Sequence, residues 1–239
     1  MYYIMENFRF TMQENQFWGK CVPCTPTVFN KNVDAPEVAR KIELRRAVDK
    51  AIRKGLSLDS FTQEREFMQF CTKKQGEKNF ATLTTAEKLL QWTNSLKSSL
   101  PCFIFGVTEF EGTQRKQAEI KHLSGLFMFD ADHLTCDPEE VYKRTLAEDF
   151  PWKVRLAHKT SSGFGLRLVC EWRTELGNIA DNQICLARDL HLMGVLGSTG
   201  KPVVDDSCID ATRISYCPRR EDIYFIDENE LFNNQSSRS

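Results

Sequence analysis

The sequence predicts an α+β fold in which helices precede a ferredoxin-like, split βαβ sheet. Two observations carry this prediction. Apolar residues recur at helical spacing in the first half of the chain, whereas apolar runs of strand length dominate the second half. In the second half, strands and helix start signals follow one another in the order β-α-β-β-α-β, which is the order of a split βαβ unit.

The first half begins with a strand-like stretch over residues 8–22, and a long helix is expected over residues 36–54. Gly55 ends this helix, because glycine readily adopts the left-handed conformation that follows a helix. The helix is predicted from an apolar stripe on one face, which consists of Leu44, Ala47, Val48, Ala51 and Ile52.

Two more helices and a strand complete the first half. One helix is expected around residues 62–72. The next opens with Thr84 and Glu87, which have the spacing of a capping box. Pro101 ends that helix, and residues 102–107 form an apolar run that predicts a buried strand.

The second half supplies the sheet. A continuous apolar run over residues 123–129 indicates a strand that is buried on both faces. Asp137, which precedes a proline and two glutamates, is expected to cap a helix. The remaining strands are expected over residues 153–158, 164–172 and 212–216, with a helix over residues 180–196.

Composition limits the function classes. The chain has 239 residues, a formal net charge of −1 and no apolar run long enough to span a membrane. We therefore expect a soluble, cytoplasmic protein with no membrane partner, and any nucleic acid must bind to a local basic patch. The expected divisions are an N-terminal α/β portion over residues 1–118, a sheet core over 119–230 and a disordered tail over 231–239, the two portions packing as one domain.

Cysteine usage indicates reduced thiols. The nine cysteines are scattered and odd in number, and Cys21 and Cys24 form the one CxxC pair. No second pair of ligands follows at a zinc-site spacing, so we interpret these two as local thiols in a turn.

Acidic residues collect at the ends of two predicted strands. Asp130 and Asp132 follow the apolar run and share one face if the strand continues. Two such carboxylates side by side favour a bound cation, and Mg²⁺ or Mn²⁺ prefers oxygen ligands of this kind. Asp205, Asp206 and Asp210 precede the last strand, which lies beside the first in a split βαβ sheet. Spacing alone leaves open which of these three completes a metal site, and an Asp-rich loop is the competing interpretation.

A glycine-containing turn supplies donors for an anion. Ser162, Gly163 and Gly165 lie between the two central strands, and Arg167 follows on the second strand. Small residues let backbone amides approach a phosphate, and an arginine binds it through charge-assisted hydrogen bonds. Arg213, on the last strand, is a second cation for a triphosphate. A plain hairpin turn is the alternative.

Four stretches of the sequence resemble VirE amino-terminal-type domains of bacterial mobile-element and replication proteins. They are Lys97–Pro101 with Phe103–Gly106, Leu123–Leu134, Thr160–Arg167 and Asp205–Arg213. These domains are similar to the archaeo-eukaryotic primase and primase-polymerase superfamily, so the resemblance implies an RRM-like sheet core with an added N-terminal α/β portion. It also implies a nucleotidyltransferase that uses nucleoside triphosphates and single-stranded or primed DNA in replication of a mobile element.

The resemblance assigns roles to individual residues. Asp130, Asp132 and Asp205 match the catalytic, metal-binding acids, and Arg213 matches a basic residue after the third acid. The nucleotide loop is matched by Ser162, Gly163 and Gly165. Arg167 stands where active primase-polymerases commonly carry a histidine, and His158 is a substitute for it upstream. This departure puts polymerase activity in doubt more than nucleotide binding.

A basic stripe on the long helix is the expected nucleic-acid contact. Arg46, Lys50, Arg53 and Lys54 share one helical face. Such a stripe can track phosphates, although a solvated helix face is the commoner arrangement.

Three functions follow. The leading hypothesis is metal-dependent nucleotide transfer on a template. The alternatives are a catalytically degenerate nucleic-acid-binding module and a metal-dependent nuclease on a similar sheet. The sequence contains no GxxxxGK[ST] motif, so any helicase partner must be a separate chain.

Overall fold

The computed structural model describes residues 8–17, 19–204 and 209–233 and has the predicted α+β class. The strands are β1 Thr11–Gln13, β2 Val22–Pro23, β3 Cys102–Ile104, β4 Val107–Phe110, β5 Ile120–Leu123, β6 Leu126–Ala131, β7 Val154–Lys159, β8 Leu166–Glu171, β9 Ser215–Tyr216 and β10 Ile223–Ile226. The helices are α1 Pro26–Val33, α2 Pro36–Lys54, α3 Asp59–Thr62, α4 Arg65–Lys74, α5 Thr85–Ser98, α6 Pro138–Lys143, α7 Ile179–Asp189 and α8 Glu228–Phe232. None of the helices in the described ranges is long and apolar enough to cross a membrane.

The main sheet has the strand order β10-β7-β8-β6 and is antiparallel throughout. One face is covered by α6 and α7, whose side chains form a core with Phe127, Phe129 and Leu168. The other face packs against the N-terminal elements through a second core that includes Leu126 and Val169. All six residues of β6 are buried, as predicted from the apolar run, but the strand begins at Leu126, and Leu123 lies exposed at the end of β5.

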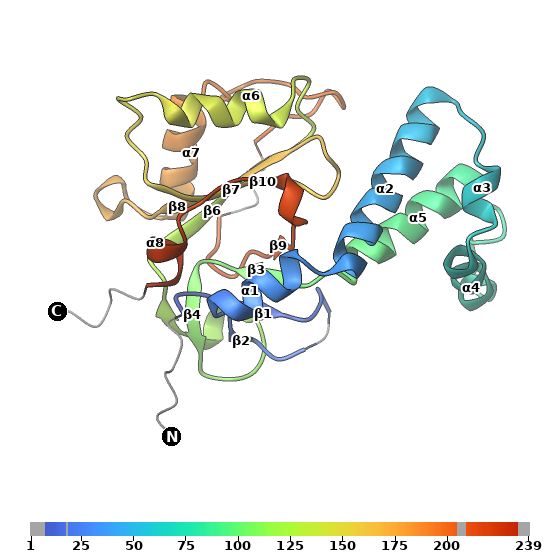
Figure 1. Ribbon diagram of the computed structural model, residues 1–239, viewed down its shortest axis with the longest axis horizontal. Helices are drawn as coiled ribbons and strands as arrows, with labels where there is room; N and C mark the ends of the chain where they lie inside the picture. Colours follow the sequence, from blue (N-terminus) through green and yellow to red (C-terminus); the bar gives the residue numbers. More distant parts are fainter. Residues whose placement is uncertain (1–7, 18, 205–208, 234–239) are drawn as a thin grey trace.

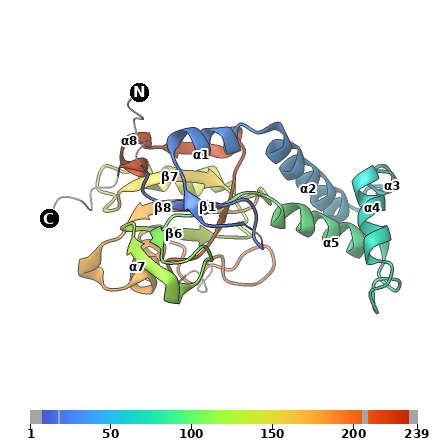
Figure 2. The same cartoon turned by 90° about the horizontal axis from the view of Figure 1, so that it is seen from below.

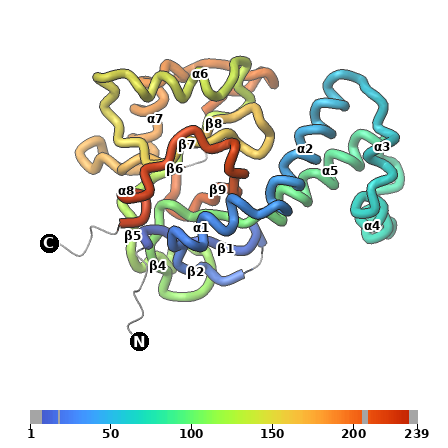
Figure 3. The backbone as a smooth tube through the Cα atoms, viewed as in Figure 1, coloured from blue at the N-terminus to red at the C-terminus, as the bar shows by residue number. Residues whose placement is uncertain are grey.

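The last predicted strand lies in a different sheet from the one expected. It was expected beside β6, but β9 pairs with β3 in the sheet β2-β1-β3-β9. The edge of β6 is instead contacted by the segment that precedes β9, through an isolated bridge between Ala131 and Val204. The chain then returns along β7 as β10 and forms α8 (Figure 3). Because β9 belongs to the N-terminal sheet and β10 belongs to the main sheet, this segment links the two sheets, which pack face to face.

Two helices of the first half form an arm that extends from the body of the molecule (Figures 1 and 2). Helices α2 and α5 pack side by side, with α3 and α4 at the far end, around a small core that contains Val48, Phe67 and Trp92. The predicted ends of both long helices are confirmed. Gly55 follows α2 with φ 60°, and Thr84 and Glu87 form the capping box of α5.

Several predicted boundaries are wrong. The stretch 8–22 forms only β1 and the start of β2, and the helix expected around 62–72 begins at Arg65. Helix α7 ends at Asp189 rather than near residue 196, because His191 has a positive φ of 54° that a continuous helix does not tolerate. Leu231 and Phe232, which were expected to belong to a disordered tail, are instead buried in α8.

Candidate functional site

Three polar side chains form one row across the main sheet, on the face turned toward the N-terminal sheet. Asp130 on β6 is the cross-strand partner of Arg167 on β8, and Arg167 is the partner of His158 on β7. Directly opposed residues project to the same face, which is also the face of Leu126 and Val169. The row is therefore buried between two sheets, and its three members are at most 7% exposed.

The buried row is a hydrogen-bonded network. Arg167 Nη2 donates to Asp130 Oδ2, and Arg167 Nη1 donates to Ser215 Oγ of β9 at 3.3 Å. His158 Nδ1 donates to the carbonyl of Lys159 at 2.9 Å, so its Nε2 accepts from Ser215 Oγ at 3.3 Å. Burial and the Arg167 charge lower the pKa of His158 to about 4, which keeps the ring neutral at pH 7.

A cavity of about 180 Å³ opens beside this row, where the arm meets the sheet. Its charged residues come from four elements: α2 supplies Arg45, α5 supplies Lys97, β8 supplies Arg167, and the segment after β6 supplies Asp132. The remaining lining residues are His133, His158, Thr160, Ser161, Ser162 and Tyr216. We call this cavity the cationic pocket, because three cationic side chains face one carboxylate.

Two of these cations are held without full compensation. Arg45 Nε and Nη1 are buried and have no hydrogen-bond partner among the described residues, and the Asp49 carboxylate lies 3.9 Å from Nε. Lys97 Nζ lies 4.7 Å from the centre of the Tyr216 ring. Burial lowers the pKa of Arg45, and burial with the charges of Arg45 and Arg167 lowers the pKa of Lys97. Such an arrangement favours a bound anion, which would satisfy the donors and relieve the repulsion.

The loop between β7 and β8 forms one wall of the pocket. Its turn is closed by a hydrogen bond from Gly163 N to Thr160 O at 2.9 Å, and Gly163 has φ +83°, which favours glycine. Gly165 is required for a different reason. A Cβ on this residue would lie 2.6 Å from Asp132 Oδ1 and 2.8 Å from the carbonyl oxygen of Ala131. The two glycines therefore let the loop turn tightly and lie against the acidic strand end.

The two acids of the DxD pair differ in their surroundings. Asp130 is paired with Arg167 through Oδ2, while its Oδ1 is buried with no hydrogen-bond partner in the described part of the chain. Asp132 lines the cationic pocket, and burial together with the Asp130 charge raises its pKa. An unsatisfied oxygen beside a destabilised carboxylate fits the electrostatic requirement of a cation site.

The third acid of the predicted metal site is not settled. Asp205 and its rival Asp206 lie outside the described residues. Asp210 accepts hydrogen bonds through Oδ1 from the backbone and hydroxyl of Thr212, at 2.7 and 2.5 Å. Within residues 8–17, 19–204 and 209–233, no three His, Cys, Asp or Glu side chains gather closely enough to hold a metal ion.

Arg213 is half-buried just before β9 and is not among the residues that line the cationic pocket. The structure thus brings Asp132, Ser162 and Arg167 together at one cavity, with Asp130 directly behind it. Three further lining residues were not assigned to the site from the sequence: Arg45, Lys97 and Tyr216. Lys97 was noted only as part of a matched stretch, and the packing that unites these residues joins segments more than a hundred positions apart.

The predicted basic stripe lies next to the same loop. Arg46 donates to both carboxylate oxygens of Asp222 at 2.9 Å and to the carbonyl of Thr160 at 2.8 Å. Its guanidinium therefore joins the arm to the loop and to the segment before β10. Lys50, Arg53 and Lys54 line a separate groove on the other side of the loop.

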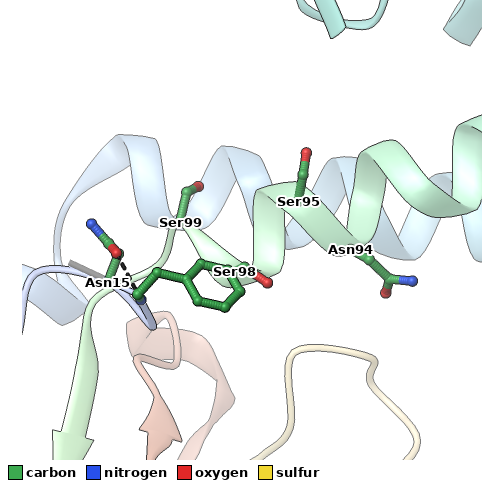
Figure 4. Close-up of a pocket in the computed structure, with 6 residues that line it drawn as sticks. Asn15, Asn94, Ser95, Ser98 and Ser99 are labelled. Atoms are coloured by element: carbon green, nitrogen blue, oxygen red, sulfur yellow. Dashed lines mark hydrogen bonds between the residues drawn. The ribbon is translucent and has the colours of Figure 1, made fainter. Parts of the chain in front are cut away.

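A larger hollow, of about 420 Å³, lies at the end of α5 and does not share this chemistry. It is lined by Asn15, Phe17, Asn94, Ser95, Ser98 and Ser99. The hollow is shallow and has no charged lining residue. In Figure 4, Asn94 and Ser95 point away from one another, so these two polar groups do not converge on one point. We therefore place the candidate site at the smaller cationic pocket, where charged groups converge.

The CxxC pair has the character of local thiols. Cys21 and Cys24 are free, Cys24 is buried, and burial raises the pKa of Cys21 to about 11 and that of Cys24 further still. Both thiols are therefore protonated at neutral pH and are poor nucleophiles.

Comparison with known proteins gives one match. A family model described as "BT4734-like, N-terminal domain" matches residues 95–225. This segment contains Lys97, the buried row and the loop between β7 and β8. No curated protein and no solved structure matches the chain.

Proposed function

The chain belongs to the BT4734-like N-terminal domain family. From the cationic pocket and the acids beside it, we propose that this member is a nucleotidyltransferase domain of the primase-polymerase type. In this proposal the domain binds nucleoside triphosphates in the cationic pocket and transfers nucleotides on a DNA template during replication of a mobile element. A separate helicase chain would supply unwound DNA, and the location would be the cytoplasm. The main sheet would be the RRM-like core of such a domain.

The observation that carries the proposal is the pair of unsatisfied hydrogen-bond donors of Arg45 in the cationic pocket. Two of its donors are buried without hydrogen-bond partners among the described residues, next to Lys97 and Arg167. A triphosphate is an anion with enough oxygens to satisfy these groups together. The Thr160–Gly165 loop would lie along the nucleotide, and Arg167 would orient the phosphates from the buried row.

The acidic residues beside this pocket fit Mg²⁺ or Mn²⁺. The orphaned Oδ1 of Asp130 and the raised pKa of Asp132 are both relieved by a divalent cation, and Asp205 would be the third ligand. When bound, such an ion supplies Lewis-acid stabilisation of phosphoryl oxygens and activation of a hydroxyl group. Asp132 would hold the ion at the mouth of the pocket, and Gly165 leaves the space that its carboxylate needs.

A specific observation favours the alternative of a catalytically degenerate binding module. Asp130 is already neutralised by Arg167 in a buried ion pair, and Arg167 stands where the primase-polymerases that the sequence resembles commonly carry a histidine. Such a pair withdraws one carboxylate from metal binding. A module of this kind would bind nucleotide or nucleic acid without transferring nucleotides.

The test is incubation of the purified chain with labelled nucleoside triphosphates, Mg²⁺ or Mn²⁺, and single-stranded DNA with and without a primer. Lengthened product supports the proposed function. Nucleotide binding without product supports the degenerate module, and shortened strands identify a nuclease.

The variant for this test follows from the burial of the two acids. Asp130→Asn removes the carboxylate that neutralises the buried Arg167 guanidinium, which costs about 3 kcal/mol or more of stability. Asp132→Asn removes a carboxylate whose pKa is already raised, so it should spare the fold and abolish incorporation. Asp149→Asn, at an exposed position, is the control and should keep full activity. Undiminished incorporation by Asp132→Asn contradicts the assignment.

A further inference from the structure

A groove of about 420 Å³ runs between α2 and the loop that follows β7. We call it the basic groove. Its walls are Arg46, Lys50, Arg53 and Lys54 on the helix and Lys159, Ser162, Gly163 and Phe164 on the sheet side. Five of these eight residues are cationic, and none is acidic, in a chain with a formal net charge of −1.

The charge of the basic groove is uncompensated at one end of α2. The cations of its earlier turns have carboxylates within 4.0 Å: Arg40, Lys41, Arg45 and Arg46. Lys50, Arg53 and Lys54 are exposed, and no described carboxylate lies within that distance of them. Because adjacent like charges on a helix repel, this arrangement favours an anion that spans the last two turns.

An aromatic ring lies among these cations. The guanidinium carbon of Arg53 is 4.3 Å from the centre of the Phe164 ring, and Phe164 is half-buried. A planar guanidinium over a ring forms a flat surface on which a nucleobase can stack. This pairing of flat and cationic groups distinguishes the groove from a site for an acidic protein segment, which needs the charges alone.

The basic groove is continuous with the cationic pocket. Ser162 lines both cavities, and the loop that carries it is the wall between them. Arg46 fixes this wall through the Thr160 carbonyl and Asp222, so its side chain is occupied within the chain. A polymer that lies in the groove therefore reaches the pocket across one loop.

We propose that the basic groove binds a single strand of nucleic acid, with phosphates against Lys50 and Lys54 and one base against Phe164 and Arg53. That this strand is the template rests on the proposed function. A single strand is favoured over a duplex because its bases are free to stack in a cavity of this size, whereas paired bases are stacked on one another.

The first measurement is the fluorescence anisotropy of a labelled oligothymidylate of about twelve nucleotides, with a hairpin duplex and a polyglutamate peptide as competitors. The chain should bind the oligothymidylate more tightly than it binds either competitor. The logarithm of its affinity should fall with the logarithm of the salt concentration with a slope of about −1.4, as expected for two phosphate contacts on a single strand.

Two variants and a matched control separate the groove from general charge. Lys50→Ala with Lys54→Ala should weaken binding about tenfold and reduce the slope by about 1.4. Lys73→Ala with Lys78→Ala removes the same charge from exposed positions on the arm and should change neither. Phe164→Leu should keep the slope and abolish the fluorescence quenching of a 2-aminopurine base in the strand.

The outcomes of these measurements decide the inference. The inference is overturned if both lysine-pair variants weaken oligothymidylate binding equally, or if the Lys50 and Lys54 variant binds as the native chain does. It is also overturned if the duplex or polyglutamate binds more tightly than the oligothymidylate. ATP binding to each variant is measured in parallel. If the native chain binds the strand but does not bind ATP, the proposed function is overturned, while the inference about the basic groove is kept. If the native chain binds ATP but does not bind the strand, the inference about the basic groove is overturned and the proposed nucleotide site is kept.

Discussion

At the scale of single residues, the buried row contains a histidine whose pKa is lowered by its surroundings. His158 is 1% exposed and neutral, and it is held by the Lys159 carbonyl and by Ser215. In the row, the Arg167 guanidinium lies between this ring and Asp130. A proton on His158 would add a second buried positive charge beside Arg167.

We expect the free energy of unfolding to fall as the pH is lowered from about 6.5 to about 4. The pKa of His158 is lowered to about 4 in the folded chain, whereas an unfolded histidine has a pKa near 6.5. Between these values the unfolded chain binds a proton that the folded chain does not, so stability decreases by up to about 3 kcal/mol. Urea unfolding of the native chain and of His158→Gln measures this difference. The exposed His122→Gln is the control, and equal pH slopes in all three chains would refute the assignment.

Residue chemistry could be predicted from sequence only where it did not depend on packing. The acids, the glycines of the loop and Arg167 were identified because they form local motifs. The ion pair between Asp130 and Arg167 was not predicted, because strand register decides it. Arg45 and Lys97 were missed as pocket residues, since each resembles an ordinary charged residue on an amphipathic helix until the arm is packed against the sheet.

At the scale of elements, the loop between β7 and β8 keeps its shape only if its backbone lies close to the end of β6. Its backbone lies against the end of β6, so that no side chain fits at Gly165. The same loop separates the cationic pocket from the basic groove. Its shape therefore controls both cavities.

Gly165→Ala should destabilise the chain by about 1–3 kcal/mol, because its Cβ would overlap the Ala131 carbonyl and Asp132. The displaced Asp132 should also weaken nucleotide binding. Gly76→Ala, where nothing lies within 4 Å of the added Cβ, is the matched control and should be neutral. Thermal denaturation of both variants checks this expectation, and a neutral Gly165→Ala would show that the loop does not need glycine there.

Element ends were predictable where a local signal sets them. Pro36, Gly55 and the capping box of α5 fix helix ends through their own backbone preferences. The partner of β9 was not predictable in the same way. A two-residue strand carries too little pattern to specify its neighbour, and pairing with β3 depends on the N-terminal sheet as a whole.

At the scale of the whole molecule, the arm meets the body at the cationic pocket, at the basic groove and at the carboxylate of Asp222. Asp222 is 3% exposed. Its carboxylate accepts hydrogen bonds from Arg46 on the arm and from Arg219 Nε at 3.0 Å. The position of the arm and the shape of the loop between β7 and β8 are therefore coupled through one buried acid.

Arg46→Met should lower the free energy of unfolding by about 3 kcal/mol, since it leaves Asp222 buried with one fewer partner. A double-mutant cycle with Asp222→Asn should give a coupling energy of at least about 1 kcal/mol. Amide hydrogen exchange in residues 160–165 should also accelerate, because Arg46 donates to two carbonyls of this loop. Additive stabilities in the cycle would show that the contact does not join the two parts.

The most direct test of the central claim is calorimetric titration of the chain with ATP, ADP and AMP. If the cationic pocket binds a triphosphate, affinity falls in that order, and Arg45→Met weakens ATP binding about tenfold or more, as expected for loss of charge-assisted hydrogen bonds. The Arg45→Met chain should be at least as stable as the native chain, because it no longer buries two unsatisfied donors. Lys73→Met, on the exposed surface of the arm, is the control. Equal affinity for the three nucleotides, or unchanged ATP binding by Arg45→Met, would contradict the account.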